Sequence, residues 1–280
     1  MTTVPLVSVV VPTRNSAGSL RVCLESIVRQ SYLSVELLVV DNYSSDATLD
    51  IARSFTQTVI TCGPERSAQR NAGARAAGGA YLLFVDSDMV LDTRVVEQCV
   101  AIVTPNTGSK LAGAIIPERS VGDGFWTRCK ALERKCYVGD DTIEAVRFFA
   151  RGSFDAVGGY DETLTAAEDW DLSQRVARTG SVGRIAAYIT HLEGRLTLRK
   201  TMRSKFYYGT TLGRYIRKQP GSAARQFQFV RPAFIRHWRL LLAHPVLTGG
   251  IIVLKGCEFA AGGVGLAVAS LRQGRTSGAT

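Results

Sequence analysis

Short apolar runs alternate with segments in which apolar residues recur every three or four positions along the first two thirds of the chain. The runs at residues 6–11 and 35–40 are rich in branched residues and end at polar ones, as buried strands do. Between them, apolar residues at helical spacing over 20–28 predict an amphipathic helix, with Asn15 or Ser16 as its N-cap. Strands alternating with helices predict a doubly wound, mostly parallel α/β sheet.

The same patterns predict the remaining elements of the chain. Further strands are expected at residues 58–61, 81–85, 111–116, 146–150 and 188–190. Further helices are expected at 46–55, 64–77, 93–103, 123–136, 168–178 and 197–219, with a turn-rich segment at 154–160.

Charge divides the chain into two parts. Residues 1–193 carry 19 Lys and Arg against 23 Asp and Glu, whereas residues 194–257 carry 13 Lys and Arg and no acidic residue. A mildly acidic body with a basic tail indicates a polyanionic partner, either nucleic acid or the anionic cytoplasmic leaflet of a membrane. We therefore expect an α/β domain at residues 1–194 and an appended, membrane-associating helical region at 195–280.

The six cysteines form no CxxC pair and no disulfide-like spacing, which favours reduced thiols in a cytosolic protein. The apolar run at 6–11 is only strand-sized and is cut by Pro12, so we expect no signal peptide at this end.

The basic tail combines cationic, aromatic and aliphatic residues, which is typical of a helix that lies in lipid headgroups. The alternative is a solvated cationic face over an apolar packing stripe.

Residues 246–271 are apolar except for Lys255 and Glu258, and each buried charge costs about 3 kcal/mol in a bilayer. Their spacing lets them pair, and several glycines permit close helix packing. We expect a monotopic or re-entrant anchor, with a single span as the alternative.

Two carboxylates follow the apolar strand that begins at residue 81. Side chains alternate along an extended segment, so Asp86 and Asp88 point to the same side. Hard oxygen ligands at the carboxyl end of a strand suit Mg²⁺ or Mn²⁺ that bridges nucleotide phosphates. The alternative is a solvated turn.

Six ordered segments resemble those of family 2 glycosyltransferases. They are VVVPTRN at 9–15, VVDNYSSD at 39–46, QRNAG at 69–73, FVDSD at 84–88, VGGYDE at 157–162 and EDWDL at 168–172. The resemblance covers residues 7–191 and implies the GT-A fold, an inverting reaction, a divalent metal and a sugar nucleotide.

The resemblance implies a nucleotide-binding set made of Pro12, Thr13, Arg14, Asn15, Asp41, Arg70, Asp86 and Ser87. Asp41 would accept the imide N–H of uracil, although guanosine and thymidine stay open, and the alternative is a helix-capping role. Arg70 would contact the diphosphate or the ribose; the alternative is a solvated helical arginine. For Arg14 the alternative is an ordinary turn residue.

The metal ligands implied by the resemblance are Asp88 directly, Asp86 through water or as a ribose contact, and His191 as the third ligand. Imidazole joined to carboxylates suits Mn²⁺, with Mg²⁺ as the other candidate. A structural role is the alternative for His191.

Asp169 resembles the family's catalytic base, which takes the proton of the acceptor hydroxyl. Glu168 and Trp170 would contact the acceptor, although Trp170 has packing as its alternative. The alternative for Asp169 is an acidic first turn favoured by the helix dipole, which fits Asp171 better.

We therefore expect a metal-dependent inverting glycosyltransferase that is peripheral or monotopic on the cytoplasmic face of the membrane. Its donor would be a nucleoside-diphosphate sugar, with UDP favoured, and its acceptor a lipid-linked or cell-envelope glycan such as a polyprenyl-diphosphate sugar. The other function classes are a basic-tail nucleic-acid-binding protein and a catalytically silent GT-A membrane scaffold. The acidic body argues against nucleic acid as a partner, and the retained Asp86, Asp88 and Asp169 argue against the scaffold.

Overall fold

The computed structural model describes residues 4–104, 111–228 and 231–277. The chain forms two compact units: the first holds residues up to 119, 144–162 and 169–192, and the second holds 120–143, 163–168 and 193 onward. Residues 1–3 and 105–110 of the predicted α/β domain, and 229–230 and 278–280 of the predicted helical region, lie outside the described residues. A single boundary at residue 194 stays a prediction.

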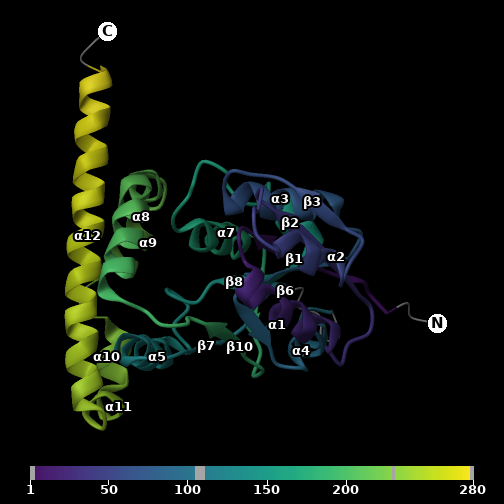
Figure 1. Ribbon diagram of the computed structural model, residues 1–280, viewed down its shortest axis with the longest axis horizontal. Coiled ribbons are helices and arrows are strands. Elements are labelled where there is room, and N and C mark those ends of the chain that lie inside the picture. The colour runs from purple at the N-terminus through teal and green to yellow at the C-terminus, as the bar shows by residue number, and fades with distance from the viewer. Residues whose placement is uncertain (1–3, 105–110, 229–230, 278–280) are drawn as a thin grey trace. The chain divides into compact units, whose positions relative to one another are not determined.

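A seven-stranded sheet forms the centre of the first unit, in the order β3-β2-β1-β4-β8-β6-β9 (Figure 1). Its strands are β1 (Val7–Thr13), β2 (Val35–Asp41), β3 (Val59–Thr61), β4 (Tyr81–Phe84), β6 (Leu111–Ile115), β8 (Val146–Ala150) and β9 (Ser181–Arg184). Only β8 runs antiparallel to its neighbours, β4 and β6. The predicted mostly parallel sheet is therefore confirmed.

Helices cover both faces of this sheet. One layer contains α1 (Ala17–Val28), α2 (Thr48–Arg53) and α4 (Val95–Val103), and the other contains α3 (Arg66–Ala76), α6 (Arg151–Ala156) and α7 (Glu168–Val176). Alternate residues of β1 pack against the two layers: Val9 and Val11 face the layer of α1, α2 and α4, and Val10 faces the layer of α3, α6 and α7. All seven residues of β1 are buried, which explains its unbroken apolar run.

Four short elements of the chain between residues 89 and 184 were not predicted. They are β5 (Met89–Leu91), β7 (Glu118–Val121), β9, and α6, whose last residues occupy part of the segment predicted to be turn-rich. β5 pairs antiparallel with β10 (Ile189–Leu192), and the small sheet has the order β5-β10-β7. Strands of three or four residues are too short to show a period.

The loops after β1 and β2 are joined by hydrogen bonds. Asn15 Oδ1 accepts the backbone N–H of Ser45 at 2.9 Å, and Asp46 Oδ2 accepts that of Ala17 at 3.2 Å. Ser16 occupies the N-cap position of α1, but its side chain makes no capping bond. The predicted N-cap position is therefore confirmed at Ser16, while Asp46 of the neighbouring loop supplies the side-chain acceptor for the first turn.

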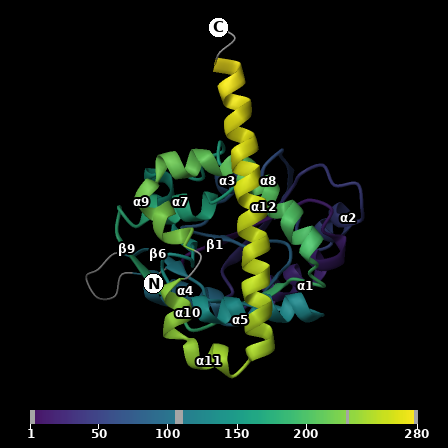
Figure 2. The same ribbon diagram turned by 90° about the vertical axis from the view of Figure 1, so that its left-hand side faces the viewer.

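Three helices form the body of the second unit: α5 (Phe125–Tyr137), α8 (Leu198–Lys218) and α12 (Pro245–Ser277). Short helices α9 (Pro220–Gln226), α10 (Pro232–Arg236) and α11 (Trp238–Leu242) connect α8 to α12. Figure 2 shows α12 running beside α8. A Cβ on Gly209 would lie 2.2 Å from the carbonyl oxygen of Gly262, so this pair allows the close packing that the glycines predict.

An ion cluster lies between α5 and α12. Lys255 Nζ pairs with Glu258 Oε2 at 2.7 Å, as predicted, and also with Glu133 Oε1 of α5 at 2.5 Å. Lys130 Nζ lies 3.0 Å from Glu133 Oε2 and 3.5 Å from Glu258 Oε1. Burial raises the pKa of Glu133, but the charges of Lys130 and Lys255 outweigh this effect and hold the pKa well below its ordinary range.

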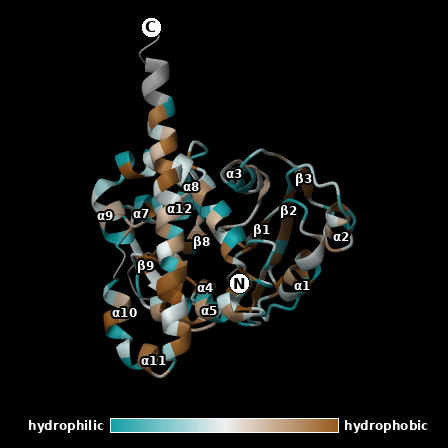
Figure 3. Ribbon diagram, turned by 60° about the vertical axis from the view of Figure 1, so that its left-hand side comes forward, coloured by the Kyte–Doolittle hydropathy of each residue, from teal (hydrophilic) through white to brown (hydrophobic). Residues whose placement is uncertain are grey.

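The opposite face of α12 is apolar and exposed. Val246, Val253, Val264 and Leu271 fall within about 20° of one line along the helix, and Figure 3 shows brown, apolar positions along this ribbon. Residues Pro245–Arg272 are long and apolar enough to cross a membrane by length and composition. The helix therefore places its charges toward α5 and its largest exposed apolar side chains away from them.

Glu133→Gln should lower the free energy of unfolding by about 3–5 kcal/mol, because it leaves the buried Lys255 and the half-buried Lys130 short of a countercharge. Guanidinium denaturation followed by far-ultraviolet circular dichroism measures this loss. Glu25→Gln is the matched control: its pair with Arg29 spans 3.6 Å in solvent and should be worth less than about 1 kcal/mol.

The loss in Glu133→Gln should shrink in acid. Because the pKa of Glu133 is lower in the folded than in the unfolded state, its stabilisation is complete above the unfolded pKa of about 4.3 and is lost as the pH falls below it. A difference between wild type and variant that stays constant down to about pH 3 would contradict the cluster's role.

Candidate functional site

Arg70 of α3 is the centre of a charge network at the carboxyl ends of the strands. Its side chain is fully buried; Nη2 donates to Asp86 Oδ1 at 2.7 Å and Nη1 to Asp169 Oδ1 at 2.8 Å. The guanidinium carbon lies 5.0 Å from the centroid of the Tyr160 ring. One planar cation thus joins the end of β4 to the first turn of α7.

A second arginine holds the other side of Asp86. Arg147 Nη1 of β8 lies 3.5 Å from Asp86 Oδ2, and Arg147 Nε donates to Glu118 Oε1 at 2.5 Å. Burial raises the pKa of Asp86, but the charges of Arg70 and Arg147 outweigh it and hold the pKa far below its ordinary range. Asp86 is therefore a carboxylate with both oxygens facing cations.

Asp169 is less enclosed than Asp86. Its side chain is 26% exposed, and among the described residues only Arg70 bonds to its carboxylate, through Oδ1. Its backbone carbonyl accepts the hydroxyl of Ser173 at 2.6 Å, which anchors the start of α7. Oδ2 is thus available to a group that enters from solvent.

Asp88 and His191 meet through the pairing of two short strands. His191 of β10 aligns with Met89 of β5, and the backbone N–H of Leu192 donates to the carbonyl oxygen of Asp88 at 2.8 Å. This register places His191 Nε2 3.2 Å from Asp88 Oδ1. The Asp88 side chain is 44% exposed, so this pair is open to solvent.

Asp41 closes the turn after β2. It aligns with Thr13 in the register of β1 and β2, and its Oδ1 accepts the Thr13 hydroxyl at 3.0 Å. Oδ2 accepts the backbone N–H of Ser44 at 2.8 Å. Asp41 is fully buried and does not cap α2, whose N-cap is Ala47.

The remaining predicted residues lie near these groups along the chain. Arg14 and Asn15 are exposed in the loop after β1, where Asn15 has a φ of 49°, and Pro12 is buried within β1. Ser87 Oγ donates to Ser16 Oγ at 2.9 Å, which ties the Asp86–Asp88 turn to the start of α1. Glu168 is buried, and Trp170 is half-buried in α7.

The family model described as "Glycosyl transferase family 2" matches residues 8–157, more than half of the chain. The chain belongs to this family. It is therefore an enzyme, a glycosyltransferase of the type that acts on nucleotide sugars.

Two curated relatives illustrate its similarity to other members. A PGL/p-HBAD biosynthesis glycosyltransferase of Mycobacterium bovis is 30% identical over 179 residues, covering 61% of this chain and 69% of the relative. The glycosyltransferase AglE of Haloferax volcanii is 36% identical over 120 residues, covering 40% of this chain and 39% of the relative.

Solved structures share the fold at low sequence identity. The mannosyltransferase PcManGT of Pyrobaculum calidifontis, solved with GDP-Man and Mn²⁺, gives a TM-score of 0.66 at 18% identity, covering 95% of this chain and 88% of that one. TarS 1-349 of S. aureus with UDP-GlcNAc gives 0.55 at 18% identity, covering 96% and 92%. The expected GT-A fold is confirmed.

In this family 2 glycosyltransferase, the structure brings Arg70, Asp86 and Asp169 into one network and Asp88 and His191 into one pair. Among the described residues, no group of three or more His, Cys, Asp or Glu side chains gathers as a metal site. The individual roles of these residues stay predictions.

Sequence reasoning missed Arg147, Glu118 and Tyr160. Arg147 interrupts the apolar run of β8, and a charge in a buried strand requires a partner, so its position was a usable signal. Tyr160 lies within the VGGYDE segment, but that pattern gave it no role in the network, and no local pattern pointed to Glu118, because both reach the network only through the tertiary fold.

Arg70→Met should lower the free energy of unfolding by about 3–5 kcal/mol, because it removes the cation that two carboxylates share. Chemical denaturation of the glycosyltransferase measures the loss. Arg75→Met is the control on the same helix: its side chain is 69% exposed, and its change should stay within about 0.5 kcal/mol. Equal losses in the two variants would contradict the bridging role of Arg70.

Proposed function

We propose that this glycosyltransferase moves a sugar from a nucleoside-diphosphate sugar to an acceptor hydroxyl with inversion, and that Asp169 is the base. The observation that carries the proposal is the shared guanidinium of Arg70, which bonds to both Asp86 and Asp169. It keeps the proposed base beside the strand end that leads to Asp88. The proposed base and donor site therefore belong to one charge network.

In the proposed reaction, Asp169 Oδ2 accepts the proton of the acceptor hydroxyl as its oxygen attacks the anomeric carbon. The new glycosidic C–O bond forms while the bond from the anomeric carbon to the diphosphate oxygen breaks. The nucleoside diphosphate leaves with that electron pair. A single displacement inverts the anomeric centre, and Arg70 bonds to Oδ1, which leaves Oδ2 without a hydrogen-bond donor among the described residues.

The nucleoside is assigned to the loops after β1 and β2. Arg14 and Asn15 are exposed there, and the turn that Asp41 closes lies opposite Thr13. Both oxygens of Asp41 already accept protein donors, so it would contact a base edge only by exchanging one of these bonds. UDP stays the favoured donor nucleotide, and the fold accommodates GDP-Man in PcManGT and UDP-GlcNAc in TarS.

The donor atoms of Asp88 and His191 fit Mn²⁺ or Mg²⁺, with Mn²⁺ favoured by the imidazole. A carboxylate oxygen and a ring nitrogen 3.2 Å apart, both near solvent, leave room for diphosphate oxygens as further ligands. Such a cation neutralises negative charge on a leaving diphosphate. Asp86 faces two arginines, so the water-mediated or ribose contact suits it better than direct ligation.

The enzyme is assigned to the membrane surface as a peripheral or monotopic protein. The stripe of Val246, Val253, Val264 and Leu271 suits the acyl boundary of a bilayer. A span would also have to carry Lys255 and Glu258, which pair with Glu133 and Lys130 of the charged helix α5. This location, with a curated relative named for PGL/p-HBAD biosynthesis, supports a lipid-linked or cell-envelope glycan acceptor.

Flotation with phosphatidylcholine and phosphatidylglycerol vesicles measures the membrane association. The full chain should float with the vesicles, because the exposed apolar stripe of α12 enters the boundary between headgroups and acyl chains. Val253→Glu/Val264→Glu, on the exposed stripe, should weaken flotation; Val22→Glu, on the exposed face of α1, is the control and should not. A full chain that does not float, or flotation of the stripe variant equal to that of the wild type, would contradict the proposed location.

The pair Asp169→Asn and Asp88→Asn should separate the base from the metal site. Asp169→Asn should lower sugar transfer at least about a hundredfold, because the amide cannot accept the proton. Its thermal stabilisation by UDP or GDP with Mn²⁺ should persist. Asp88→Asn should lose the part of that stabilisation that depends on Mn²⁺. Transfer assays and thermal-shift titrations with and without Mn²⁺ measure both effects.

Normal turnover by Asp169→Asn would remove it from the base role. Mn²⁺-dependent stabilisation that is unchanged in Asp88→Asn would remove that residue from the metal site, whatever the result for Asp169.

A further inference from the structure

Tyr43 is an exposed aromatic residue in the loop after β2. The residue is 75% exposed, and its backbone φ of 49° lies in the left-handed region. Glycine adopts this conformation without a steric cost, whereas for a bulky side chain it is an outlier. Neither burial nor an easy backbone geometry accounts for a ring at this position, and such outliers gather at sites that bind ligands.

Hydrogen bonds hold the loop on both sides of Tyr43. Before it, the backbone N–H of Asn42 donates to the carbonyl oxygen of Thr13 at 2.9 Å. After it, Ser44 Oγ accepts the backbone N–H of Asn15 at 2.8 Å. Both neighbours of Tyr43 are thus tied to β1 and its following loop, and the strained residue sits on a fixed turn.

Strand register places this turn at the proposed nucleoside site. Thr13 and Asp41 are aligned at the carboxyl ends of β1 and β2, so Arg14 directly follows one strand end and Tyr43 follows the other by two residues. Arg14 is also exposed, and its guanidinium has no hydrogen-bonding or ion-pair partner among the described residues. Two planar side chains are therefore open to solvent on adjacent loops.

A nucleobase needs a contact for its flat face as well as for its polar edge. The polar groups at this end of β2 are engaged with one another, because Thr13 and Ser44 both donate to Asp41 Oδ1. Aromatic side chains supply the contact for the face, and they serve every base because every base has a π-face. An exposed tyrosine therefore suits the nucleoside whether the base is uracil, guanine or thymine.

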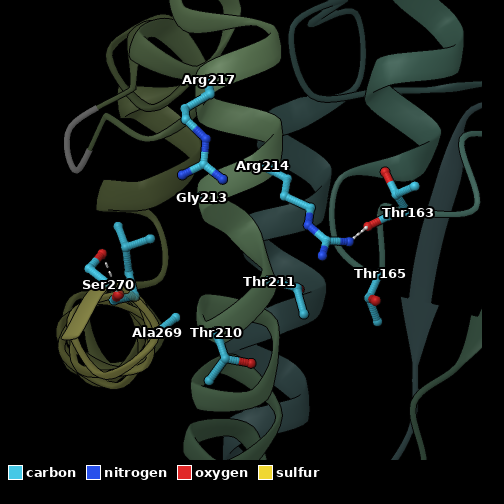
Figure 4. A pocket seen from close by; sticks show the side chains of 10 residues that line it. Thr163, Thr165, Thr210, Thr211, Gly213, Arg214, Arg217, Ala269 and Ser270 are labelled. Atoms are coloured by element: carbon cyan, nitrogen blue, oxygen red, sulfur yellow. Dashed lines mark hydrogen bonds between the residues drawn. The ribbon is translucent and has the colours of Figure 1, made fainter. Parts of the chain in front are cut away.

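A hollow in the second unit lacks such a surface. It has a volume of about 140 Å³ beside α8 and α12, and its described lining residues are threonines, arginines, a serine and small or aliphatic residues (Figure 4). Arg214 Nη1 donates there to the carbonyl oxygen of Thr163 at 2.9 Å. A base in this hollow would have hydrogen-bond donors but no aromatic ring beside it, so the loops of the first unit suit the nucleoside better.

We propose that the ring of Tyr43 stacks on the base of the donor nucleotide. This inference rests on the proposed function, because it requires a nucleoside diphosphate at the carboxyl ends of β1 and β2. The ring contributes affinity for the nucleoside. Selection of one base is left to hydrogen bonds at the edge of the base, because stacking does not distinguish the bases.

Isothermal titration calorimetry of the full chain with Mn²⁺ measures this contact. UDP, GDP and dTDP are the probes, and the variants are titrated with the one that the wild type binds most tightly. Tyr43→Ala should weaken binding at least about fivefold, because removing a stacked ring costs about fivefold to 150-fold in affinity. Tyr43→Phe keeps the ring and should bind within about twofold of the wild type. Tyr188→Ala removes another exposed tyrosine of the first unit and should bind as the wild type does.

Inorganic pyrophosphate with Mn²⁺ separates the base contact from the diphosphate contact. Because it has no base, Tyr43→Ala should bind it as the wild type does. An equal loss for pyrophosphate and for the nucleotide would show a disturbed diphosphate site and would overturn the stacking contact.

Tyr43→Gly separates the loss of the ring from a loss of the fold. Glycine adopts a φ of 49° without strain, so this variant should unfold at the same or a higher guanidinium concentration than the wild type. It should nevertheless lose nucleotide binding as Tyr43→Ala does. A loss of binding that occurs only with a loss of stability would overturn the role of the ring.

The wild type distinguishes failure of this inference from failure of the proposed function. If the wild type binds a nucleoside diphosphate and Tyr43→Ala binds it equally well, the stacking contact is overturned and the proposed function stands. If the wild type binds none of the three nucleotides, the proposed function fails and the stacking contact fails with it.

Discussion

The arrangement of the first unit depends on a buried guanidinium. Arg70 is fully enclosed, and an enclosed cation is strongly unfavourable unless it is paired. Asp86, just after β4, and Asp169, in α7, supply that pairing from 16 and 99 residues further along the chain than Arg70. Because the charge of Arg70 must be paired, the end of β4 and the start of α7, which carry the proposed chemistry, are held at a fixed distance. Arg147 and Glu118 extend the same constraint to β8 and β7.

The second unit combines buried charges with exposed apolar side chains. Its charged residues Lys130, Glu133, Lys255 and Glu258 lie inside, between α5 and α12, while apolar side chains face outward. A helix with this polarity would be unstable alone in water or alone in lipid. Pairing with α5 removes the cost of its charges, and an amphiphilic surface would remove the cost of its exposed stripe. This unit is thus suited to a boundary between the two phases.

Much of the fold could be predicted because the signals were local. β1 and β2 were predicted because strands buried on both faces have unbroken apolar runs, and α12 because its apolar run is long. β5 and β9 were missed because three or four residues carry no period. The pairing of Lys255 with Glu258 followed from their spacing. The α5 partners of Lys255 and Glu258 could not be predicted from the sequence, because no local pattern relates residues more than 120 positions apart.

The residues of the site could be predicted from the sequence, but most contacts between them could not. Six ordered segments located Arg70, Asp86, Asp88 and Asp169, and a histidine after the last of them located His191. The expected contact of Arg70 with a ligand gave no indication of its burial between two carboxylates, because that depends on how α3, β4 and α7 pack. The pair formed by His191 and Asp88 likewise depends on the register of β5 with β10.

The stereochemistry of transfer tests the central claim most directly. If Asp169 acts as the base for a single displacement, a donor of known anomeric configuration gives a product of the opposite configuration, which proton NMR of the new linkage reads from its anomeric coupling. We expect inversion in every product molecule formed at early times. A product that retains the donor's configuration would exclude a single back-side displacement, and would contradict the proposed role of Asp169 as the base held in place by Arg70.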